Sequence, residues 1–257
     1  MRLDVFLAEH GLTKSRSRAA ELISAGHVCI NGKAARKASA DVSDSDKVEI
    51  TGEIHPYVGR GGVKLEGALE NFDVDVTNSV CADIGASTGG FTDCLLKHGA
   101  AFVYAIDSGH GQLDRSLLAN EKVKNIENFN ARFLTSEVIG EKCDIVVADL
   151  SFISQTLIIP TVAGILKNSG KYIALIKPQF ECGREALGKN GIVKDKNEHI
   201  AAIRKVLSIA AENGLYPKKL MKSKIKGGDG NTEFLFLAER VPPQTVADSE
   251  IKETVNE

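Results

Sequence analysis

The strongest constraint on this chain is a glycine-rich segment at residues 80–96, V-C-A-D-I-G-A-S-T-G-G-F-T-D-C-L-L. Residues 80–84 are apolar except for one acid, which predicts a buried strand, and apolar residues at helical spacing follow the glycines. A strand that turns into a helix through glycines presents unpaired backbone N–H groups and lets a nucleotide-like ligand approach closely. An ordinary strand-to-helix turn of an α/β domain fits the same pattern, because short glycine motifs have many false positives.

The order of the acid and the glycines separates two classes of nucleotide site. The spacing here is D-x-G-x-x-x-G-G, with Asp83 two residues before Gly85. Dinucleotide-dependent dehydrogenases carry G-x-G-x-x-G instead, so the spacing argues against that class. The segment resembles the S-adenosylmethionine loop of Rossmann-like methyltransferases.

Charge and cysteine usage limit the class of protein further. The 257 residues carry a formal net charge of only −2, so any nucleic-acid binding must come from a local basic patch. The five cysteines form no C-x-x-C pair, which predicts reduced thiols in a cytoplasmic protein, without a disulfide framework or a zinc site. The longest apolar stretch, residues 157–166, is too short to cross a bilayer, and the N-terminus shows no apolar signal core. We therefore expect no membrane partner.

Residues 1–53 form a region with a character of its own. Two helical patterns precede short alternating strands, and Asn31-Gly32 is a hairpin signal. Residues 1–40 contain seven Lys and Arg against three acids, a local charge of +4. A basic face on a small module indicates a site for a nucleic-acid backbone, although a solvated helix face explains the charge alone equally well.

The pattern in this region is more specific than its charge. L-D-x-F-L-x-x-x-G-L-x-x-S-R-x-x-A-x-x-L-I-x-x-G-x-V-x-I-N-G resembles the alpha-L RNA-binding domain, which recurs in pseudouridine synthases and tyrosyl-tRNA synthetases. Such a module reads structured RNA largely by shape, through phosphates. Residues 54–60 are expected to form a linker whose partly apolar H-P-Y-V stretch packs on one of the domains. The resemblance implies six RNA-binding residues: Lys14, Arg16, Arg18, Lys33, Arg36 and Lys37.

Residues 61–241 alternate apolar strands with helices, which indicates a parallel sheet covered on both faces. With the resemblance of the glycine loop, this predicts an α/β fold of the Rossmann-like class I methyltransferase type, with a mostly parallel seven-stranded sheet, after a small N-terminal α+β domain. The tail at 242–257 begins with two prolines, and we expect it to be loosely attached. Besides residues 80–84, the expected strands are 101–106, 124–127, 144–148, 172–176, 220–225 and 233–238.

Four polar residues are expected at one edge of this sheet. Asp149 and Lys177 end two buried strands, Lys64 lies on the helix before the first strand, and Glu233 opens the last strand. Each alone is more often a solvated terminus, but together they would form a cluster of two amines and two acids. A ribose 2′-hydroxyl is a weak nucleophile, and a lysine kept neutral by burial and a neighbouring ammonium group can take its proton. Methyl transfer from a sulfonium needs mainly positioning and no metal.

Further motifs make the resemblance closer. S-T-G-G-F-T, G-H-G-Q-L, A-D-L-S-F-I-S, I-K-P-Q-F-E and G-N-T-E-F together resemble the TlyA family over nearly the whole chain. That family joins the alpha-L domain to an FtsJ-like 2′-O-ribose methyltransferase with a Lys-Asp-Lys-Glu tetrad, and Lys64, Asp149, Lys177 and Glu233 fall on its motifs. The resemblance implies methyl transfer from S-adenosylmethionine to a cytidine 2′-hydroxyl in ribosomal RNA. The target is in the large subunit and, in some members, also in the small subunit.

The same resemblance implies a cofactor site. Asp83 would anchor the methionine amine, Asp107 would bind the ribose, and Asn128 or Asn130 would border the adenine. The methionine end would lie in a cradle formed by Gly85, Ala86, Ser87, Gly89, Gly90 and Phe91.

Three other functions fit parts of the sequence. A degenerate methyltransferase fold would only hold RNA, and measured turnover separates that protein from an enzyme. A pseudouridine synthase shares the N-terminal module but needs no S-adenosylmethionine loop. A membrane-acting haemolysin is suggested by the TlyA family's history, although the sequence shows no basic amphipathic helix for a membrane surface. No obligate protein partner is evident in the sequence.

Overall fold

The computed structural model describes residues 1–13, 15–52, 55–227 and 230–257. Contacts divide the chain into two compact units, Met1–Pro56 and Tyr57–Glu257. The division falls inside the stretch expected to be a linker, and its last residues belong to the second unit. Among the described residues, no helix is long and apolar enough to span a membrane.

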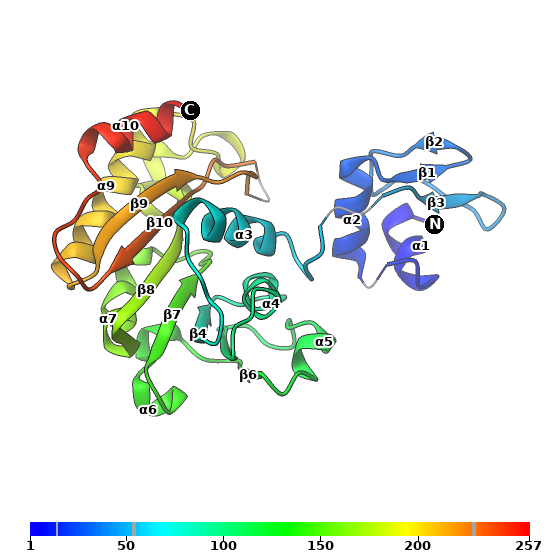
Figure 1. Cartoon of the computed structure of the whole chain (residues 1–257). Coiled ribbons are helices and arrows are strands. Elements are labelled where there is room, and N and C mark those ends of the chain that lie inside the picture. Colours follow the sequence, from blue (N-terminus) through cyan, green and yellow to red (C-terminus); the bar gives the residue numbers. More distant parts are fainter. Residues whose placement is uncertain (14, 53–54, 228–229) are drawn as a thin grey trace. The chain divides into compact units, whose positions relative to one another are not determined.

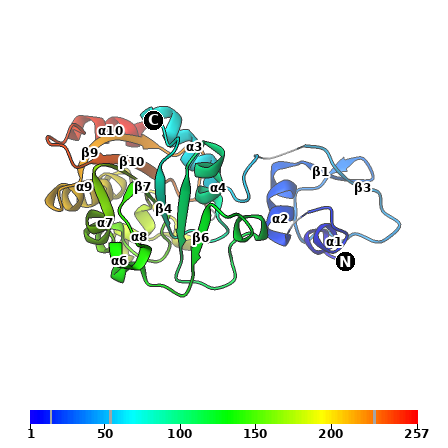
Figure 2. The same ribbon diagram turned by 60° about the horizontal axis from the view of Figure 1, so that its bottom comes forward.

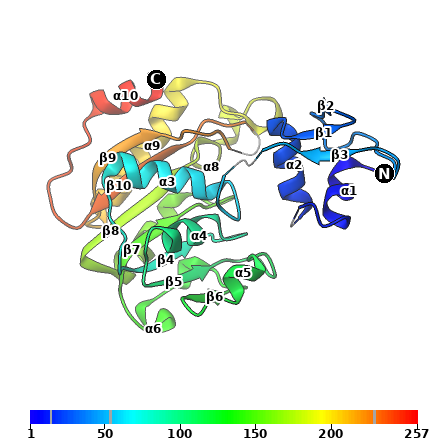
Figure 3. The same cartoon turned by 45° about the vertical axis from the view of Figure 1, so that its right-hand side comes forward.

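The first unit packs two helices on a small antiparallel sheet with strand order β2-β1-β3 (Figure 3). Its core comes from the apolar stripes of the two helices, including Leu3, Leu7 and Ile23. The Ser15 side chain caps the second helix by accepting a hydrogen bond from Arg18 N at 3.2 Å, and Gly26 ends that helix at φ +80°. The expected helices and hairpin are therefore present. The elements are α1 (Leu3–Glu9), α2 (Arg16–Ala25), β1 (Val28–Ile30), β2 (Lys33–Ala34) and β3 (Val48–Ile50).

The second unit is built on a seven-stranded sheet with the order β6-β5-β4-β7-β8-β10-β9. The first five strands in this order pair in parallel, whereas β10 pairs antiparallel with both β8 and β9. The predicted mostly parallel seven-stranded sheet is confirmed. The strands are β4 (Val80–Ile84), β5 (Phe102–Ile106), β6 (Val123–Ile126), β7 (Cys143–Ala148), β8 (Leu166–Ile176), β9 (Tyr216–Lys222) and β10 (Phe234–Glu239).

Helices cover both faces of this sheet (Figures 1 and 2). One apolar cluster joins α3 (Gly61–Phe72) and α4 (Gly90–Lys97) to one face, and a larger cluster joins α7 (Ile159–Ile165) and α9 (Lys196–Glu212) to the other. Strands buried on both faces account for the continuous apolar runs in the sequence. The short helices of this unit are α5 (Arg115–Leu118), α6 (Ser136–Ile139) and α8 (Pro178–Glu181), with 3₁₀ turns η1 (Ala131–Phe133), η2 (Gln155–Leu157), η3 (Arg184–Ala186) and η4 (Lys189–Gly191).

The expectation of a loosely attached tail is wrong. The chain ends in α10 (Asp248–Asn256), which packs against α9 and β9. Ile251 and Val255 lie on one face of this helix and are buried in the larger core cluster, and Asp248 pairs with Arg204 at 2.6 Å. The two prolines interrupt regular structure before the helix, whereas Ile251 and Val255 lie four residues apart, which is the spacing of one helix face.

The end of the expected linker packs on the second unit. Tyr57 is buried in the cluster that contains α3 and α4, and its hydroxyl donates to Glu66 Oε1 at 2.7 Å. Val58 N donates to Asp93 Oδ2 at 2.9 Å. The prediction that the apolar part of this stretch packs on a domain is confirmed for these two residues.

Candidate functional site

The fold brings the four residues of the expected tetrad together. Lys64 lies within α3, Asp149 follows β7, Lys177 follows β8, and Glu233 directly precedes β10. β7 and β8 are parallel neighbours, and β10 runs antiparallel beside β8. The ends of β7 and β8 and the start of β10 therefore lie at the same edge of the sheet. Lys177 Nζ is 2.5 Å from Asp149 Oδ1, and Lys64 Nζ is 2.6 Å from Glu233 Oε2 and 3.8 Å from Asp149 Oδ2.

The four side chains of this cluster are largely removed from water and carry opposite charges. Glu233 is the least exposed of the four side chains at 2%, and both lysine side chains are buried. Two ammonium groups and two carboxylates sum to zero formal charge, so the ionised cluster is balanced although it is removed from water. The Lys177 ammonium also donates to Ser151 Oγ at 3.0 Å, which fixes the direction of its remaining protons. The arrangement therefore fixes the Lys177 Nζ atom beside the Asp149 carboxylate.

The glycine loop approaches this cluster closely. Gly85 has φ +85°, and a Cβ on it would lie 2.6 Å from the backbone oxygen of Asp149. Gly89 has φ +94°, and a Cβ on it would lie 2.2 Å from Leu117 Cδ1. A Cβ on Gly90 would lie 3.0 Å from the backbone of the α3 start. These glycines are required because protein atoms, rather than only a ligand, occupy the space beside them.

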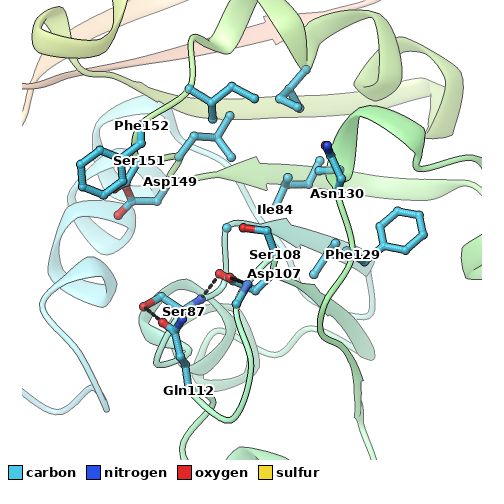
Figure 4. A pocket seen from close by; sticks show the side chains of 17 residues that line it. Ile84, Ser87, Asp107, Ser108, Gln112, Phe129, Asn130, Asp149, Ser151 and Phe152 are labelled. Carbon is cyan, nitrogen blue, oxygen red and sulfur yellow. Dashed lines mark hydrogen bonds between the residues drawn. The ribbon is translucent and has the colours of Figure 1, made fainter.

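A pocket of about 450 Å³ opens beside the loop, within the range of small-ligand sites (Figure 4). The Asp107 carboxylate fixes two backbone segments that line the pocket. Its Oδ2 accepts a hydrogen bond from Ser87 N at 2.8 Å, and its Oδ1 accepts one from Gly109 N at 2.6 Å. In Figure 4, Asp149, Ser151 and Phe152 lie on one side of the pocket and Asn130 on another. The pocket is lined by Ile84, Gly85, Ser87, Ile106, Asp107, Ser108, Gly109, Gln112, Phe129, Asn130, Ala131, Asp149, Leu150, Ser151, Phe152, Ile153 and Ile158.

The structure places the expected cofactor residues in two groups. Four of them line the pocket: Gly85, Ser87, Asp107 and Asn130. Six do not: Asp83, Ala86, Gly89, Gly90, Phe91 and Asn128. Of the two asparagines, Asn130 borders the pocket, whereas the Asn128 amide contacts His110 Nδ1 at 3.3 Å.

Asp83 stabilises the glycine loop through hydrogen bonds made in the protein interior. Its side chain is fully buried, and Oδ2 accepts from Thr92 N at 2.9 Å and from Thr92 Oγ1 at 2.7 Å. Burial raises the pKa of Asp83 to about 7. The carboxyl group therefore ties the end of β4 to the first turn of α4, and it takes no part in the lining of the pocket. Phe91 is likewise buried, in the cluster behind the loop.

Several pocket residues were missed by the sequence reasoning. Phe129 and Gln112 lie in loops, a few residues after the end of a strand. In such loops the spacing of residues does not show which side chains point into the pocket. Phe152 falls in the A-D-L-S-F-I-S motif, four residues after the end of β7, and the sequence does not show that its side chain reaches the pocket. It is 91% exposed, has φ +65° and lies 5.2 Å from the Phe180 ring centroid.

The residues of the pocket fit S-adenosylmethionine. The Asp107 carboxylate is a ready acceptor for ribose hydroxyls, and apolar side chains such as Ile106 and Phe129 suit an adenine ring. Ser87 and Gln112 are linked by a hydrogen bond of 3.1 Å, so the polar side of the pocket is already ordered. Among the residues that the structure describes, no cluster of His, Cys, Asp and Glu suits a metal ion.

A buried network supports the tetrad from behind. The Glu181 carboxylate, at the end of α8, accepts from Ser154 Oγ at 2.5 Å and from Gln155 N at 2.7 Å. Gln155 in turn donates to the backbone oxygen of Leu175 and accepts from the Tyr172 hydroxyl. Burial raises the pKa of Glu181. The network ties the loop that carries Asp149 to the segment that follows Lys177, so it fixes the relative position of these two ends.

We predict that Glu181→Gln lowers kcat about 10-fold and leaves the affinity for S-adenosylmethionine unchanged. The amide has one acceptor oxygen and would face a donor with its NH₂ group, so one of the two hydrogen bonds is lost and Lys177 shifts relative to Asp149. Single-turnover rates at saturating cofactor check this. Glu185→Gln, which changes an exposed acid four residues later, should stay within about twofold, and equal rates for both variants would contradict the positioning role.

In the first unit, the expected RNA-binding residues differ in availability. Lys33 and Lys37 are exposed, and Arg36 packs its guanidinium over Gly26. Arg16 pairs with Asp4 at 3.1 Å, and its side chain remains exposed. Arg18 is turned inward, where its guanidinium contacts Glu21 and donates to the His55 backbone oxygen at 2.8 Å. Lys14 lies outside the described residues.

Comparisons with known proteins agree with this organisation. The family model described as FtsJ-like methyltransferase matches residues 57–240, and the S4 domain model matches residues 1–48. The chain is 42% identical to "Hemolysin A" of Brachyspira hyodysenteriae over 91% of this chain and 98% of the relative. It is also 42% identical to "16S/23S rRNA (cytidine-2'-O)-methyltransferase TlyA" of Mycobacterium tuberculosis, over 91% of this chain and 88% of the relative.

A solved structure supports the same assignment. A protein from Streptococcus thermophilus that carries a hemolysin name has a TM-score of 0.81 and 40% identity, covering 100% of this chain and 94% of that chain. The methyltransferase match of the second unit sets aside the pseudouridine synthase alternative, and the S4 match confirms an RNA-binding module at the N-terminus. The chain therefore belongs to the TlyA family, in which an S4 domain precedes an FtsJ-like methyltransferase domain.

Proposed function

We propose that this chain transfers the methyl group of S-adenosylmethionine to the 2′-hydroxyl of a cytidine in ribosomal RNA. The observation that carries the proposal is the double role of Asp149. It lines the pocket that fits the cofactor, and it pairs with both lysines of the tetrad. A nucleophile activated at the tetrad would thus lie directly beside a methyl donor held in the pocket.

The geometry of the tetrad suggests how the residues divide the chemistry. S-adenosylmethionine, when bound, supplies an activated methyl group on a sulfonium. Lys177, once it has given up one proton to solvent, would accept the proton of the 2′-hydroxyl at Nζ when that oxygen takes the methyl group. Asp149, 2.5 Å away, stabilises the ammonium that results. Lys64, which pairs with Glu233, also contacts the other carboxylate oxygen of Asp149. Once Lys177 carries the proton, the four side chains again sum to zero formal charge.

The substrate follows from the N-terminal unit and the relatives. An S4 domain holds structured RNA through its phosphates, and the relative from M. tuberculosis is named for 16S and 23S ribosomal RNA. We infer a ribosomal subunit as the working partner, which implies a cytoplasmic protein. Purified subunits that lack the modification, offered separately with labelled S-adenosylmethionine, test this. Label in the large subunit, alone or together with the small subunit, supports the proposal, and no transfer to either subunit contradicts it.

Phe152 is suited to hold the target base. A nucleotide must leave its stack for its ribose to reach a buried tetrad, and an exposed aromatic face can replace the lost stacking. Phe152 offers such a face at the mouth of the pocket, where Phe180 supports it. We predict that Phe152→Ala lowers kcat/KM for RNA about 10-fold, since one base–aromatic stack contributes about 1–3 kcal/mol. Because Phe152 is 91% exposed at the mouth of the pocket, its loss should weaken the binding of S-adenosylmethionine less than it lowers kcat/KM for RNA.

Phe133→Ala provides the matched control for this variant. Phe133 is also an exposed phenylalanine of the second unit, but it does not line the pocket. Steady-state methylation of ribosomal subunits should therefore change little in Phe133→Ala. Equal losses in the two variants would show that exposed aromatic surface in general, and not stacking at the pocket, accounts for the effect.

A further inference from the structure

The hydroxyl group of Ser151 lies outside the tetrad and contacts its proposed base. Lys177 Nζ donates a hydrogen bond to Ser151 Oγ at 3.0 Å and lies 2.5 Å from Asp149 Oδ1. Ser151 is an exposed residue that also lines the pocket that fits the cofactor. Figure 4 shows it beside Asp149, on the same side of that pocket. Ser151 therefore connects the proton acceptor of the tetrad with the place where the methyl donor would lie.

The loop that carries Ser151 faces the segment that begins with Lys177. Ser151 contacts Lys177, and the next residue, Phe152, lies against Phe180 with the ring centroids 5.2 Å apart. In an extended chain the side chains of neighbouring residues point in opposite directions. Phe152 instead has φ +65°, and this turn lets both side chains face residues 177–180. The backbone of the loop therefore helps to place the Ser151 hydroxyl beside Nζ.

The two lysines of the tetrad differ in the charge of the oxygens beside them. Lys64 Nζ pairs with two carboxylates, Glu233 at 2.6 Å and Asp149 at 3.8 Å. Among the residues that the structure describes, Lys177 Nζ pairs with one carboxylate, Asp149, and donates to one neutral oxygen, Ser151 Oγ. A carboxylate stabilises a neighbouring ammonium by its charge, whereas a neutral hydroxyl adds only a hydrogen bond. Ser151 thus gives Lys177 a second acceptor without a second negative charge that would hold its proton.

The two oxygens beside Lys177 also decide where its lone pair points. A neutral amine keeps two N–H bonds and one lone pair, in three different directions. With one N–H directed to Asp149 Oδ1 and the other to Ser151 Oγ, the lone pair takes the remaining direction. When Nζ receives a proton, its hydrogen bond to Ser151 strengthens, because the donor becomes charged. An interaction that is stronger in the transition state than before it raises the rate of the chemical step.

We propose that Ser151 is a positioning residue of the methyl transfer: it directs the lone pair of Lys177 toward the 2′-hydroxyl and stabilises the ammonium that forms. Ser151 keeps its own proton and acts only as an acceptor, so the proton of the 2′-hydroxyl still ends on Lys177. The inference rests on the proposed function and deepens it, because it adds to the tetrad a neutral group that sets the geometry of the base.

Ser151→Ala tests the hydroxyl directly. Its single-turnover rate on unmodified large ribosomal subunits should be about 10-fold below that of the wild type, because a hydrogen bond to a charged donor is lost. Both S-adenosylmethionine and subunits are kept saturating, since Ser151 also lines the pocket. Ser151→Thr keeps a hydroxyl and should stay within about threefold of the wild type, and Ser208→Ala, at an exposed serine of α9, should leave the rate unchanged. A Ser151→Ala protein as fast as the wild type, or a Ser151→Thr protein as slow as Ser151→Ala, would overturn the proposal.

Ser151→Asp separates the charge of the acceptor from its position. Aspartate keeps an acceptor oxygen but adds a second carboxylate beside Lys177, which stabilises the ammonium form. The rate of this variant should be lower than that of the wild type at pH 7 and should level off at a higher pH. The other charged side chains of the cluster, Asp149, Lys64 and Glu233, are unchanged. The same pH profile for both proteins would show that residue 151 does not act on the proton of Lys177, and it would overturn the proposal.

A second background shows whether the hydroxyl acts through Lys177. In Lys177→Ala, adding Ser151→Ala should change the single-turnover rate by less than about twofold, because no amine remains to be directed. An equal loss in both backgrounds would mean that Ser151 acts on the cofactor or on folding, and it would overturn the proposal. The wild-type rate separates this inference from the proposed function. Methylation by the wild type with an unaffected Ser151→Ala overturns the inference alone, and no methyl transfer by the wild type overturns both.

Discussion

Replacing Lys177 with alanine is expected to lower kcat for methyl transfer by about 10³, the middle of the range for a lost general base. The variant removes the atom that receives the 2′-hydroxyl proton and leaves the Asp149 carboxylate without its partner at 2.5 Å. The cofactor pocket does not include Lys177, so the affinity for S-adenosylmethionine should remain within about twofold. Single-turnover methylation of large ribosomal subunits, with cofactor binding measured by calorimetry, checks both parts.

Lys167→Ala is the matched control for this variant. Lys167 lies near the start of β8, the strand that Lys177 follows at its other end, and it also pairs with an aspartate, Asp144, at 2.8 Å. Its loss should leave kcat nearly unchanged. A Lys177→Ala protein that keeps a third or more of the wild-type rate would remove Lys177 from the mechanism.

Asp107→Ala is expected to weaken the binding of S-adenosylmethionine about 100-fold. The carboxylate accepts hydrogen bonds from the backbone of Ser87 and Gly109, so it shapes the loop as well as offering an acceptor to the ribose. Hydrogen bonds to a charged group contribute about 1.5–3 kcal/mol each, and each 1.4 kcal/mol corresponds to a factor of ten. The rate at saturating cofactor should fall far less than the affinity, because the tetrad is not altered.

Calorimetric titration of the cofactor tests this expectation. Glu121→Gln removes an exposed acid from the loop before β6 and should bind the cofactor like the wild type. Asp107→Asn keeps the shape of the side chain and should lie between Asp107→Ala and the wild type. A change of less than about threefold in Asp107→Ala would place the ribose elsewhere in the pocket.

The arrangement of the sheet and of the tetrad could be predicted because both depend on simple rules. Each of the seven expected strands overlaps an observed one, although β8 begins at residue 166 instead of 172 and β9 spans residues 216–222 instead of 220–225. The polar residues at the ends of the buried parallel strands had to share one edge of the sheet. Asp149 and Lys177 thus followed from position, with the family motifs as a second indication. The contact between Lys64 and Glu233 depends on how α3 packs on the sheet, which local patterns do not determine.

The details of the pocket were less accessible from the sequence. The sequence shows which positions of a turn are glycines. It does not show whether a bound ligand or neighbouring protein atoms leave no room for a side chain there. Gly89 and Gly90 are constrained by Leu117 and by the start of α3, and Asp83 is buried beneath the loop. Phe152 reaches the surface through a positive φ that an aromatic residue seldom adopts, so no propensity rule predicts it.

The central claim, that this chain methylates the ribose of a ribosomal cytidine, is tested most directly by the chemical identity of the product. Large ribosomal subunits that lack the modification would be incubated with the protein and labelled S-adenosylmethionine, and the RNA digested to nucleosides. The account predicts label in 2′-O-methylcytidine and loss of that label in Lys177→Ala. Label in a base-methylated nucleoside would contradict the claim. Absence of label, although the protein binds both S-adenosylmethionine and the ribosomal subunit tightly, would also contradict it.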